Sequence, residues 1–275
     1  MNTAQSLGNI PITDVEYSQF QKLIYQIAGI SLSDAKRVLL VGRLSKRLKK
    51  LDIPTFSQYY RLVTSGTQQA ELQTMVDLLT TNETYFFREP KHFDFLSEQA
   101  KRHREGSFRI WSAASSSGEE AYSMAMVLAE TLGERPWEIV GTDISTQVIN
   151  RAQRGHYPLD RTEGIPPFML RKYCLKGMGE HDGTLLVAKE LRERVLFQQS
   201  NLMSPRQGLG QFDMIFLRNV MIYFDADTKR KVVANLLPYL KNDGHFIVGH
   251  SESLNGLSNE LHPLRPTICR RATSA

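Results

Sequence analysis

Residues 109–120 read RIWSAASSSGEE, which predicts a short buried strand, a turn of very small residues and the start of a helix. Small side chains allow a ligand to approach the backbone closely, and a helix N-terminus presents unpaired N–H groups to it. A phosphate would favour such a helix N-terminus, but Glu119 and Glu120 would repel it. Two carboxylates suit a ligand with a cationic centre and hydroxyl groups. S-adenosylmethionine (SAM) is such a ligand, since it carries a sulfonium, an ammonium and a ribose.

The composition is typical of a globular protein with one large or two modest domains. Of the 275 residues, 41% are hydrophobic and 23% are charged. The sequence has no apolar run of about 18 residues, and residues 1–8 lack the order of a signal peptide, so we expect no membrane insertion. Cys174 and Cys269 match neither a metal site nor a disulfide framework, which favours the cytoplasm. The net charge of +5 permits an acidic partner without indicating nucleic acid.

The N-terminal third of the chain predicts a run of helices. Thr13, Ser33 and Thr55 each stand where an N-cap residue is expected. Gly29 stands where a left-handed glycine ends a helix. No strand-like alternation occurs in this part of the sequence. We therefore expect a separate all-helical domain over residues 1–80.

After this helical region, apolar strand segments alternate with helical ones. The expected strands are Phe108–Trp111, Trp137–Gly141, Val195–Gln198, Met214–Leu217 and His245–Val248. The expected helices are Ala121–Leu132, Ser145–Arg154 and Asp227–Leu240. This alternation predicts a doubly wound α/β domain over residues 81–275. Residues 155–193 are rich in Gly and Pro and interrupt the alternation, which predicts an inserted subdomain.

Polar residues follow the expected strands, where a doubly wound domain holds its ligand. Asp143 stands at the distance from Gly118 where an acidic residue meets ribose hydroxyls in dinucleotide-binding folds. Asn201 and Leu202 follow a later strand, and they suit the amino edge and the face of an adenine. The simpler alternatives are that Asp143 caps a helix, that Asn201 is a turn residue and that Glu119 complements a helix dipole. The joint pattern favours a nucleoside-type ligand.

The segment LTTNETYFFREP joins the two regions and combines polar side chains with three aromatic ones. Aromatic side chains can form the wall of a pocket into which Asn82, Thr84 and Arg88 point. The alternative is a helix end packed at the domain interface, with Arg88 paired to one of its two neighbouring glutamates.

These segments resemble the chemotaxis receptor methyltransferases, the CheR family. The resemblance covers nearly the whole chain and rests on five motifs in this order: TTNETYFFRE, WSAASSSGEEAYSMAM, GTDIS, NLM and FLRNVMIYF. It implies transfer of a methyl group from SAM to glutamate side chains of chemoreceptors, with S-adenosylhomocysteine as the other product. It also implies a small helical N-terminal domain that docks on the receptor and a SAM-binding (Rossmann-like) α/β domain with an inserted antiparallel β-subdomain.

The resemblance also implies the residues of the site. Arg88 and Tyr223 would lie beside the transferred methyl group, with Arg88 orienting the incoming carboxylate. The SAM-binding residues would be Asn82, Thr84, Arg88, Glu119, Asp143, Asn201, Leu202, Leu217, Arg218 and Asn219. A glutamate nucleophile has a pKa of about 4.3 and is ionised at neutral pH, so neither a general base nor a metal is expected.

A basic helix face is the first candidate surface for receptor docking. It has the spacing i, i+3, i+4, i+7 and is formed by Arg43, Lys46, Arg47 and Lys50. Such a face is more often simply solvated, but the resemblance implies an acidic helical receptor as its partner. Nucleic acid is not expected, because the face has no aromatic interleaving and matches no binding motif.

A glycine-rich loop in the inserted region is the second candidate surface. It contains Gly177, Gly179 and His181, and it resembles the β-subdomain loop that binds the C-terminal pentapeptide of a receptor by edge-strand addition. The alternative is a plain glycine-rich hairpin. No cluster supports His181 as a metal ligand, and we expect His245 and His250, which flank a strand, to be structural.

Two other functions compete with receptor methylation. One is a SAM-dependent methyltransferase that acts on nucleic acid or a small molecule. The other is a scaffold that binds SAM or a nucleotide and docks on receptors without catalysis, although Arg88 and Tyr223 argue against it. We expect a cytoplasmic monomer that binds the cytoplasmic domain of chemoreceptors.

Overall fold

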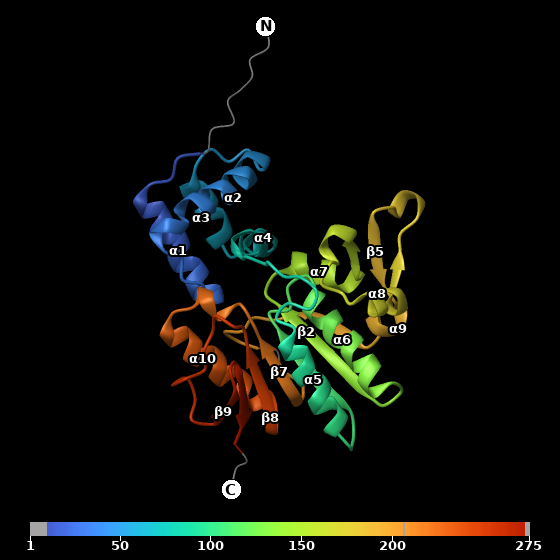
Figure 1. Cartoon of the computed structure of the whole chain (residues 1–275). Helices are drawn as coiled ribbons and strands as arrows, with labels where there is room; N and C mark the ends of the chain where they lie inside the picture. The colour runs from blue at the N-terminus through green and yellow to red at the C-terminus, as the bar shows by residue number, and fades with distance from the viewer. Residues whose placement is uncertain (1–9, 206, 273–275) are drawn as a thin grey trace. The chain divides into compact units, whose positions relative to one another are not determined.

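The computed structural model describes residues 10–205 and 207–272, and the chain divides into two compact units, Met1–Thr81 and Asn82–Ala275 (Figure 1). Within the described residues, no helix is both long and apolar enough to cross a membrane.

The first unit is entirely helical in its described part. Its elements are α1 (Asp14–Ala28), the 3-10 turn η1 (Asp34–Lys36), α2 (Arg37–Lys50), α3 (Phe56–Thr64) and α4 (Gln69–Leu79). The expected cap at Thr13 is confirmed as a capping box, in which the side chains of Thr13 and Glu16 each accept the other's backbone N–H. Gly29 ends α1 at φ 71°, and the Thr55 side chain caps α3, both as predicted.

The start of the second helix differs from the prediction. Ser33 precedes the 3-10 turn η1, and its side chain makes no capping hydrogen bond. The α-helix begins only at Arg37. A side-chain cap therefore does not start α2; its first turn instead continues from the 3-10 turn, a tighter helix that is common at helix ends.

The second unit is built on a mixed sheet of seven strands in the order β6-β2-β1-β7-β8-β10-β9. Its strands are β1 (Phe108–Ala113), β2 (Trp137–Asp143), β6 (Val195–Gln199), β7 (Phe212–Leu217), β8 (Leu240–Val248), β9 (Leu261–Arg265) and β10 (Ile268–Arg271). The strands β6, β2, β1, β7 and β8 form a parallel sheet. The strand β10 lies between β8 and β9 and runs antiparallel to both.

The centre of this sheet is its switch point. From β1 the chain continues to β2 and β6 on one side, and then returns to β7 and β8 on the other. The carboxyl ends of β1 and β7 therefore border the crevice where doubly wound folds bind ligands. Gly141 of β2 pairs with Phe197 of β6, and a Cβ at Gly141 would lie 2.5 Å from the Phe197 ring. Only glycine fits this close contact without a shift of the ring.

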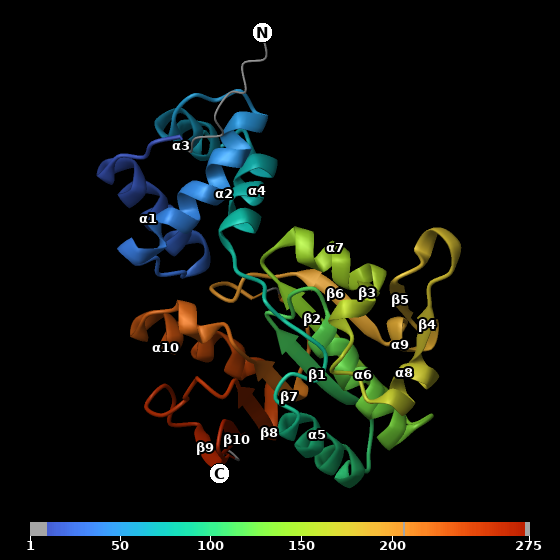
Figure 2. The same cartoon turned by 45° about the horizontal axis from the view of Figure 1, so that its top comes forward.

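Helices flank the sheet, and α5 and α6 lie side by side in both views (Figures 1 and 2). The helices and 3-10 turns outside the insertion are α5 (Lys91–Arg102), α6 (Glu119–Leu132), α7 (Thr146–Arg154), α9 (Lys189–Arg192), η4 (Met221–Tyr223), α10 (Ala226–Leu236) and η5 (Leu237–Tyr239). The elements α5, β9 and β10 are not among those expected from the sequence. The expected helix Asp227–Leu240 is too long, since α10 ends at Leu236, because Pro238 lacks the N–H that would continue the helix.

The insertion after α7 forms a small antiparallel sheet in the order β3-β5-β4. Its elements are β3 (His156–Pro158), η2 (Leu159–Arg161), α8 (Pro167–Tyr173), β4 (Cys174–Lys176), η3 (Gly179–His181) and β5 (Thr184–Val187). The buried face of this sheet includes Tyr157, Leu185 and Val187, which join the core of the second unit. The insertion is thus packed on the α/β domain by its apolar face.

Candidate active site

The small-residue turn after β1 has an unusual backbone. Ala114, Ser116 and Gly118 have φ values of 67°, 49° and 96°, in the left-handed region. The Ser116 N–H donates to Asp143 Oδ2 at 3.0 Å, and the Ser115 N–H donates to the Thr142 carbonyl at 2.8 Å. The end of β2 therefore holds the turn in its strained conformation.

Gly118 is the N-cap of α6, and no other residue type fits there without a shift. A Cβ at this position would lie 2.9 Å from Ala152 Cβ and 3.0 Å from both the Phe197 ring and the Tyr157 hydroxyl. Tyr157 belongs to the inserted sheet, and its hydroxyl donates to the Ser117 carbonyl at 2.7 Å. The insertion thus supports the turn from one side, and β2 supports it from another.

Gly118→Ala is expected to lower the free energy of unfolding by at least about 1–2 kcal/mol, the cost of a left-handed backbone for an L-residue. It should also weaken binding of S-adenosylhomocysteine, because the turn must shift to relieve the contact with Ala152. Urea unfolding and calorimetric titration measure the two effects. Gly106→Ala is the control, since Gly106 has a φ of 71° but no described atom within 4 Å of an added Cβ. Unchanged ligand affinity in Gly118→Ala would contradict a role of the turn in binding.

Glu119 places a buried carboxylate at the N-terminus of α6. Its side chain is 1% exposed, accepts a hydrogen bond from the Ser117 hydroxyl at 2.7 Å and lies 4.0 Å from the Arg161 guanidinium. Burial raises the pKa of Glu119 above its ordinary value. A cationic or hydroxyl-bearing ligand would provide the partner that a buried carboxylate requires.

The other predicted strand-end residues lie in ordered turns. The Asp143 carboxylate accepts hydrogen bonds from the N–H of Ser116 at 3.0 Å and the N–H of Ser145 at 2.9 Å. Asp143 therefore holds the turn after β1 in place, with or without a ligand. Asn201 Oδ1 accepts the Met203 N–H at 2.9 Å, as in an Asx turn. Leu202 is half-buried directly after Asn201.

The segment between Asn82 and Glu89 contacts several of these elements. The Asn82 carbonyl accepts the Ser116 hydroxyl at 3.0 Å, and the Thr84 carbonyl accepts from Arg161 at 3.0 Å. Arg88 donates to the Glu83 carbonyl at 3.1 Å and lies over the Tyr85 ring at 5.5 Å. The alternative in which Arg88 pairs with a neighbouring glutamate carboxylate is not observed among the described residues.

Glu89 instead belongs to a buried ionic cluster. Arg218 donates to Glu89 Oε2 at 2.9 Å, to Glu120 Oε2 at 2.7 Å and to the Arg88 carbonyl. Its side chain is 1% exposed. Glu120 also accepts the Ser112 hydroxyl at 2.7 Å, so its carboxylate has internal partners. The family resemblance implies that Arg218 binds SAM, whereas both terminal nitrogens of its guanidinium donate to groups within the protein.

The loop after β7 carries the remaining predicted residues. Leu217 is fully buried in the core, and Tyr223 is half-buried in η4. Asn219 has a φ of 58°, and Glu252 holds it there. The Glu252 carboxylate accepts three backbone N–H groups at 2.7 Å each, those of Asn219, Met221 and Gly249. The sequence did not indicate this role of Glu252, because Asn219 and Met221 lie more than 30 residues before it in the chain.

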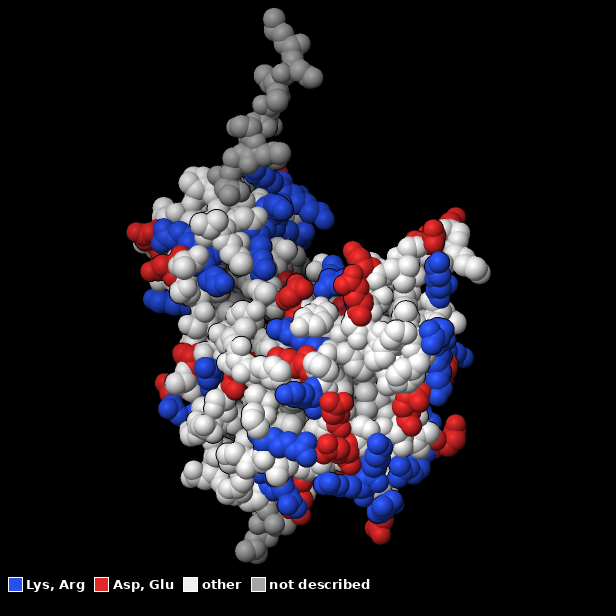
Figure 3. Space-filling view, viewed as in Figure 1, with Lys and Arg blue, Asp and Glu red and all other residues white. Residues whose placement is uncertain are grey.

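Two of the four predicted basic docking residues have internal partners. Arg43 donates to the Leu78 carbonyl at 3.1 Å and the Thr80 carbonyl at 2.8 Å, and Arg47 forms a salt bridge with the buried Glu71. The exposed cations of this helix are Lys46, Lys49 and Lys50. Figure 3 shows Lys and Arg side chains gathered on the part of the first unit that carries α2.

The predicted loop of the inserted sheet is exposed. Gly179 lies in the 3-10 turn η3 at φ 60°, and the ring of His181 stacks edge-on against His156 at 5.7 Å. A Cβ at Gly177 would lie 1.9 Å from the His181 carbonyl, so this tight loop requires glycine there. The exposed apolar side chains nearby are Leu175 and Met178.

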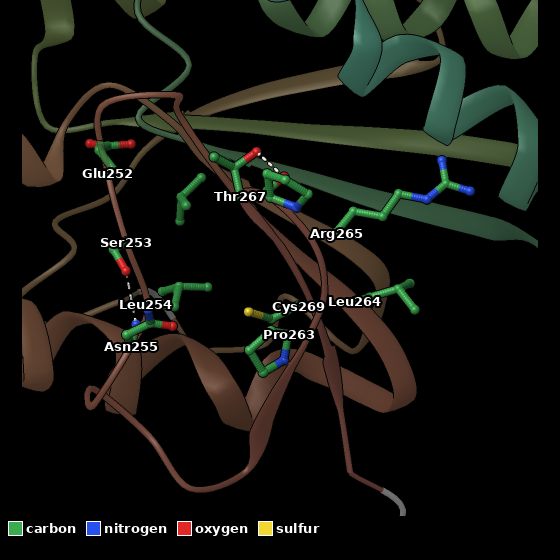
Figure 4. Close-up of a pocket in the computed structure, with 11 residues that line it drawn as sticks. Glu252, Ser253, Leu254, Asn255, Pro263, Leu264, Arg265, Thr267 and Cys269 are labelled. Atoms are coloured by element: carbon green, nitrogen blue, oxygen red, sulfur yellow. Dashed lines mark hydrogen bonds between the residues drawn. The ribbon is translucent and has the colours of Figure 1, made fainter.

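A pocket of ≈ 310 Å³ lies elsewhere in the second unit, between the loop after β8 and the strands β9 and β10 (Figure 4). Leu254, Pro263 and Cys269 contribute to its lining. None of the predicted catalytic or SAM-binding residues lines it. This pocket is therefore separate from the switch-point crevice.

The arrangement can hold a nucleoside with a cationic group. Small residues form the turn at the switch point, the Glu119 carboxylate lies at the start of α6 after this turn, and Asp143 lies at the end of β2. These acceptor groups fit SAM, because a carboxylate can accept hydrogen bonds from an ammonium or from ribose hydroxyls. The fold and the site define a SAM-dependent α/β methyltransferase.

Comparison with known proteins gives the family. The description "CheR methyltransferase, SAM binding domain" matches residues 82–268, and "CheR methyltransferase, all-alpha domain" matches residues 15–80. The chain belongs to the CheR methyltransferase family. It is 41% identical over 260 residues to a chemotaxis protein methyltransferase of Escherichia coli (strain K12), and this match covers 94% of this chain and 91% of the relative. It is 39% identical over 261 residues to chemotaxis protein methyltransferase 2 of Pseudomonas aeruginosa, covering 93% and 92%.

Proposed function

We propose that this protein methylates glutamate side chains of chemoreceptors, forming methyl esters that adapt chemotactic signalling. The observation that carries the proposal is the 41% identity to a chemotaxis protein methyltransferase across 94% of the chain. The acidic turn at the switch point supports SAM as the methyl donor. We place the reaction in the cytoplasm, at the cytoplasmic domain of the receptor, and propose that the enzyme acts as a monomer.

The SAM-binding residues that we propose lie on the segment before α5 and at the strand ends. Glu119 and Asp143 would accept hydrogen bonds from the ammonium and the ribose, and Asn201 would face the adenine. Asn82, Thr84, Arg88, Leu202, Leu217 and Asn219 complete the proposed set. Leu217 contributes through its backbone, because its side chain is fully buried. For Arg218 we propose an indirect role, in which it holds Glu89 and Glu120 in place.

SAM supplies an activated methyl group on its sulfonium. The protein has to hold the glutamate nucleophile in line and exclude water, because the carboxylate is already ionised at neutral pH. We propose that the Arg88 guanidinium orients this carboxylate and that the Tyr223 hydroxyl aligns it. Arg88 suits this role because its partners within the described part of the chain are a carbonyl and an aromatic ring, which leave its charge uncompensated.

The exposed lysines of α2 are the proposed docking surface for an acidic receptor. Lys46→Glu with Lys50→Glu is expected to slow receptor methylation by about 10-fold or more at low salt, because charge steering raises association rates by 10- to 1000-fold. The difference from the unaltered enzyme should shrink as salt is added. Initial rates at several receptor concentrations measure this effect.

The matched control reverses two exposed charges elsewhere in the same unit, Lys22→Glu with Arg61→Glu. If this control variant slows methylation equally, the net charge of the protein causes the effect and the lysines of α2 have no special role. Arg47 is unsuitable for this test, since its salt bridge with Glu71 is structural.

The inserted sheet is the proposed tether for a receptor tail. Strand β4 lies at an edge of the β3-β5-β4 sheet, so its outer side is available for an added peptide strand. Leu175 is 59% exposed and Met178 is 83% exposed near this edge, and both can contact an apolar peptide side chain. A receptor without its C-terminal pentapeptide should then be methylated more slowly at low receptor concentration.

The proposed activity is tested with labelled SAM and membranes that contain chemoreceptors. Label that mild alkali releases as methanol would identify carboxyl methyl esters. Labelling of nucleic acid instead would support a different substrate class. SAM binding without transfer to any tested receptor would favour the scaffold alternative.

A further inference from the structure

Three metal-ligating groups come together beside the ionic cluster of Arg218. Glu89, His92 and His250 each offer one ligand atom, and these atoms all lie within 4.8 Å of one another. His92 Nδ1 is 3.4 Å from Glu89 Oε2, and His250 Nε2 is 3.9 Å from the same oxygen. We infer that these residues form a binding site for a divalent transition-metal ion with the ligand preferences of Zn²⁺. The role of this ion is structural, since methyl transfer to an ionised carboxylate requires no metal.

The hydrogen bonds of His92 determine which ring nitrogen is available. The Thr267 hydroxyl donates to the Pro266 carbonyl at 2.6 Å (Figure 4), so it accepts from His92 Nε2 at 2.7 Å. The Nε2 atom therefore carries the proton, and Nδ1 carries a lone pair. His92 is 2% exposed, and its Nδ1 has no hydrogen-bond partner among the described residues.

A buried lone pair that faces a carboxylate at 3.4 Å is unfavourable unless a cation lies between them. Zinc–ligand distances of about 2.0–2.1 Å in tetrahedral geometry separate two ligand atoms by about 3.3 Å. The spacing between His92 Nδ1 and Glu89 Oε2 matches this value. His250 is 55% exposed, so its ring can turn to shorten its 3.9 Å distance to Glu89.

The surrounding charges allow a cation at this position. Arg218 is shared between Glu89 and Glu120, so these three groups carry a net charge of about −1. A carboxylate oxygen has more than one lone pair and can accept from Arg218 while it binds a metal. The Thr267 hydroxyl supplies the outer hydrogen bond that orients a metal-bound histidine.

A bound ion would connect two distant parts of the second unit. Glu89 and His92 lie at the start of α5, whereas His250 follows β8, 161 residues after Glu89 in the chain. The fourth position of a tetrahedral site would be left to water. The ion would thus stabilise the segment that carries Arg88 without touching the proposed methyl-transfer groups.

Titration of the metal-free protein with Co²⁺, followed by its visible d–d absorption, tests the inference. We expect saturation with one Co²⁺ per chain, its displacement by Zn²⁺ and a higher unfolding midpoint in the presence of Zn²⁺. His250→Ala should weaken Co²⁺ binding by about 100-fold or more. Loss of a residue that only hydrogen-bonds a metal ligand weakens metal binding by about 10- to 100-fold, so a larger loss indicates a direct ligand. His92→Ala should do the same, but its burial makes His250→Ala the decisive variant, because an exposed histidine can be removed without unfolding.

His262→Ala is the matched control, since His262 is an exposed histidine on β9. Unchanged Co²⁺ affinity in His250→Ala, or no d–d absorption at all, would overturn the inference. Loss of Co²⁺ binding in the double variant His156→Ala with His181→Ala would also overturn the inference, because it would show that the metal binds at the inserted sheet. Methyl transfer by the metal-free protein is measured separately, and we expect it to persist.

Discussion

Arg218→Met is expected to lower the free energy of unfolding at pH 7 by about 3–5 kcal/mol, because among the described residues Arg218 is the only Lys or Arg partner of two largely buried carboxylates. Glu89 and Glu120 are 11% and 13% exposed, so water compensates little for the lost charge. Methionine retains most of the side-chain volume, which limits the contribution of a new cavity.

Urea unfolding measures the loss, and Arg270→Met is the control. Arg270 forms a salt bridge of 2.8 Å with Asp243, and both side chains are about half exposed. Such a surface pair contributes less than about 1 kcal/mol. If the two variants lose equal stability, Arg218 does not have the structural role that its contacts indicate.

The pH dependence of unfolding provides a second test of the same cluster. Burial alone would raise the pKa of Glu89, but the charge and hydrogen bonds of Arg218 outweigh it and hold the pKa at about 2, below the ordinary 4.5. Because the folded pKa is the lower one, Glu89 contributes stability above pH 4.5 that is lost as the pH falls toward 2. This loss should be smaller in Arg218→Met, where the unpaired Glu89 has a higher folded pKa.

Arg88→Ala is expected to lower the turnover of receptor methylation by about 100- to 1000-fold, the cost of losing one positioned charge-stabilising group. Its effect on stability should stay within about 0.5 kcal/mol. The reason is that Arg88 is half-buried and, among the residues that the structure describes, makes one hydrogen bond, to the Glu83 carbonyl, together with its contact to Tyr85. The two variants should therefore differ in kind: the Arg218 substitution should lower stability, whereas the Arg88 substitution should lower the rate of methylation.

Single-turnover methylation with saturating SAM separates the chemical step from SAM binding. Arg88→Lys retains the charge without the planar fork and should recover part of the activity. Arg154→Ala removes an exposed arginine at the end of α7 and serves as the control. Full turnover by Arg88→Ala with normal SAM affinity would contradict the proposed orientation of the carboxylate by Arg88.

Local signals in the sequence were sufficient for much of the secondary structure. The capping box at Thr13, the left-handed Gly29 and the cap at Thr55 depend on neighbouring residues, and all three are confirmed. The five expected strands correspond to β1, β2, β6, β7 and β8, because their apolar runs are buried in a parallel sheet. The strands β9 and β10 were not predicted. For β9 the reason is that the strand is mostly exposed and includes Pro263, so it lacks an apolar run.

The motifs of the sequence also determined the family and the SAM-dependent class, which the comparisons confirm. They could not distinguish residues that bind a ligand from those that hold the site together. Arg47 has the spacing of a docking residue, but its guanidinium pairs with Glu71. Such a pairing depends on how two helices pack, which the spacing along one helix does not reveal.

The tertiary structure alone decided the partners of the buried charges. Arg218 meets Glu120 across 98 residues and Glu89 across 129, and Glu252 holds the backbone of the loop after β7 from more than 30 residues away. Burial forces each charge to find a partner, but it does not specify which one. Hydrophobic periodicity and capping act over a few residues, so the sequence determined the elements and the family. The ionic contacts between distant strand ends depend on how the sheet brings those ends together.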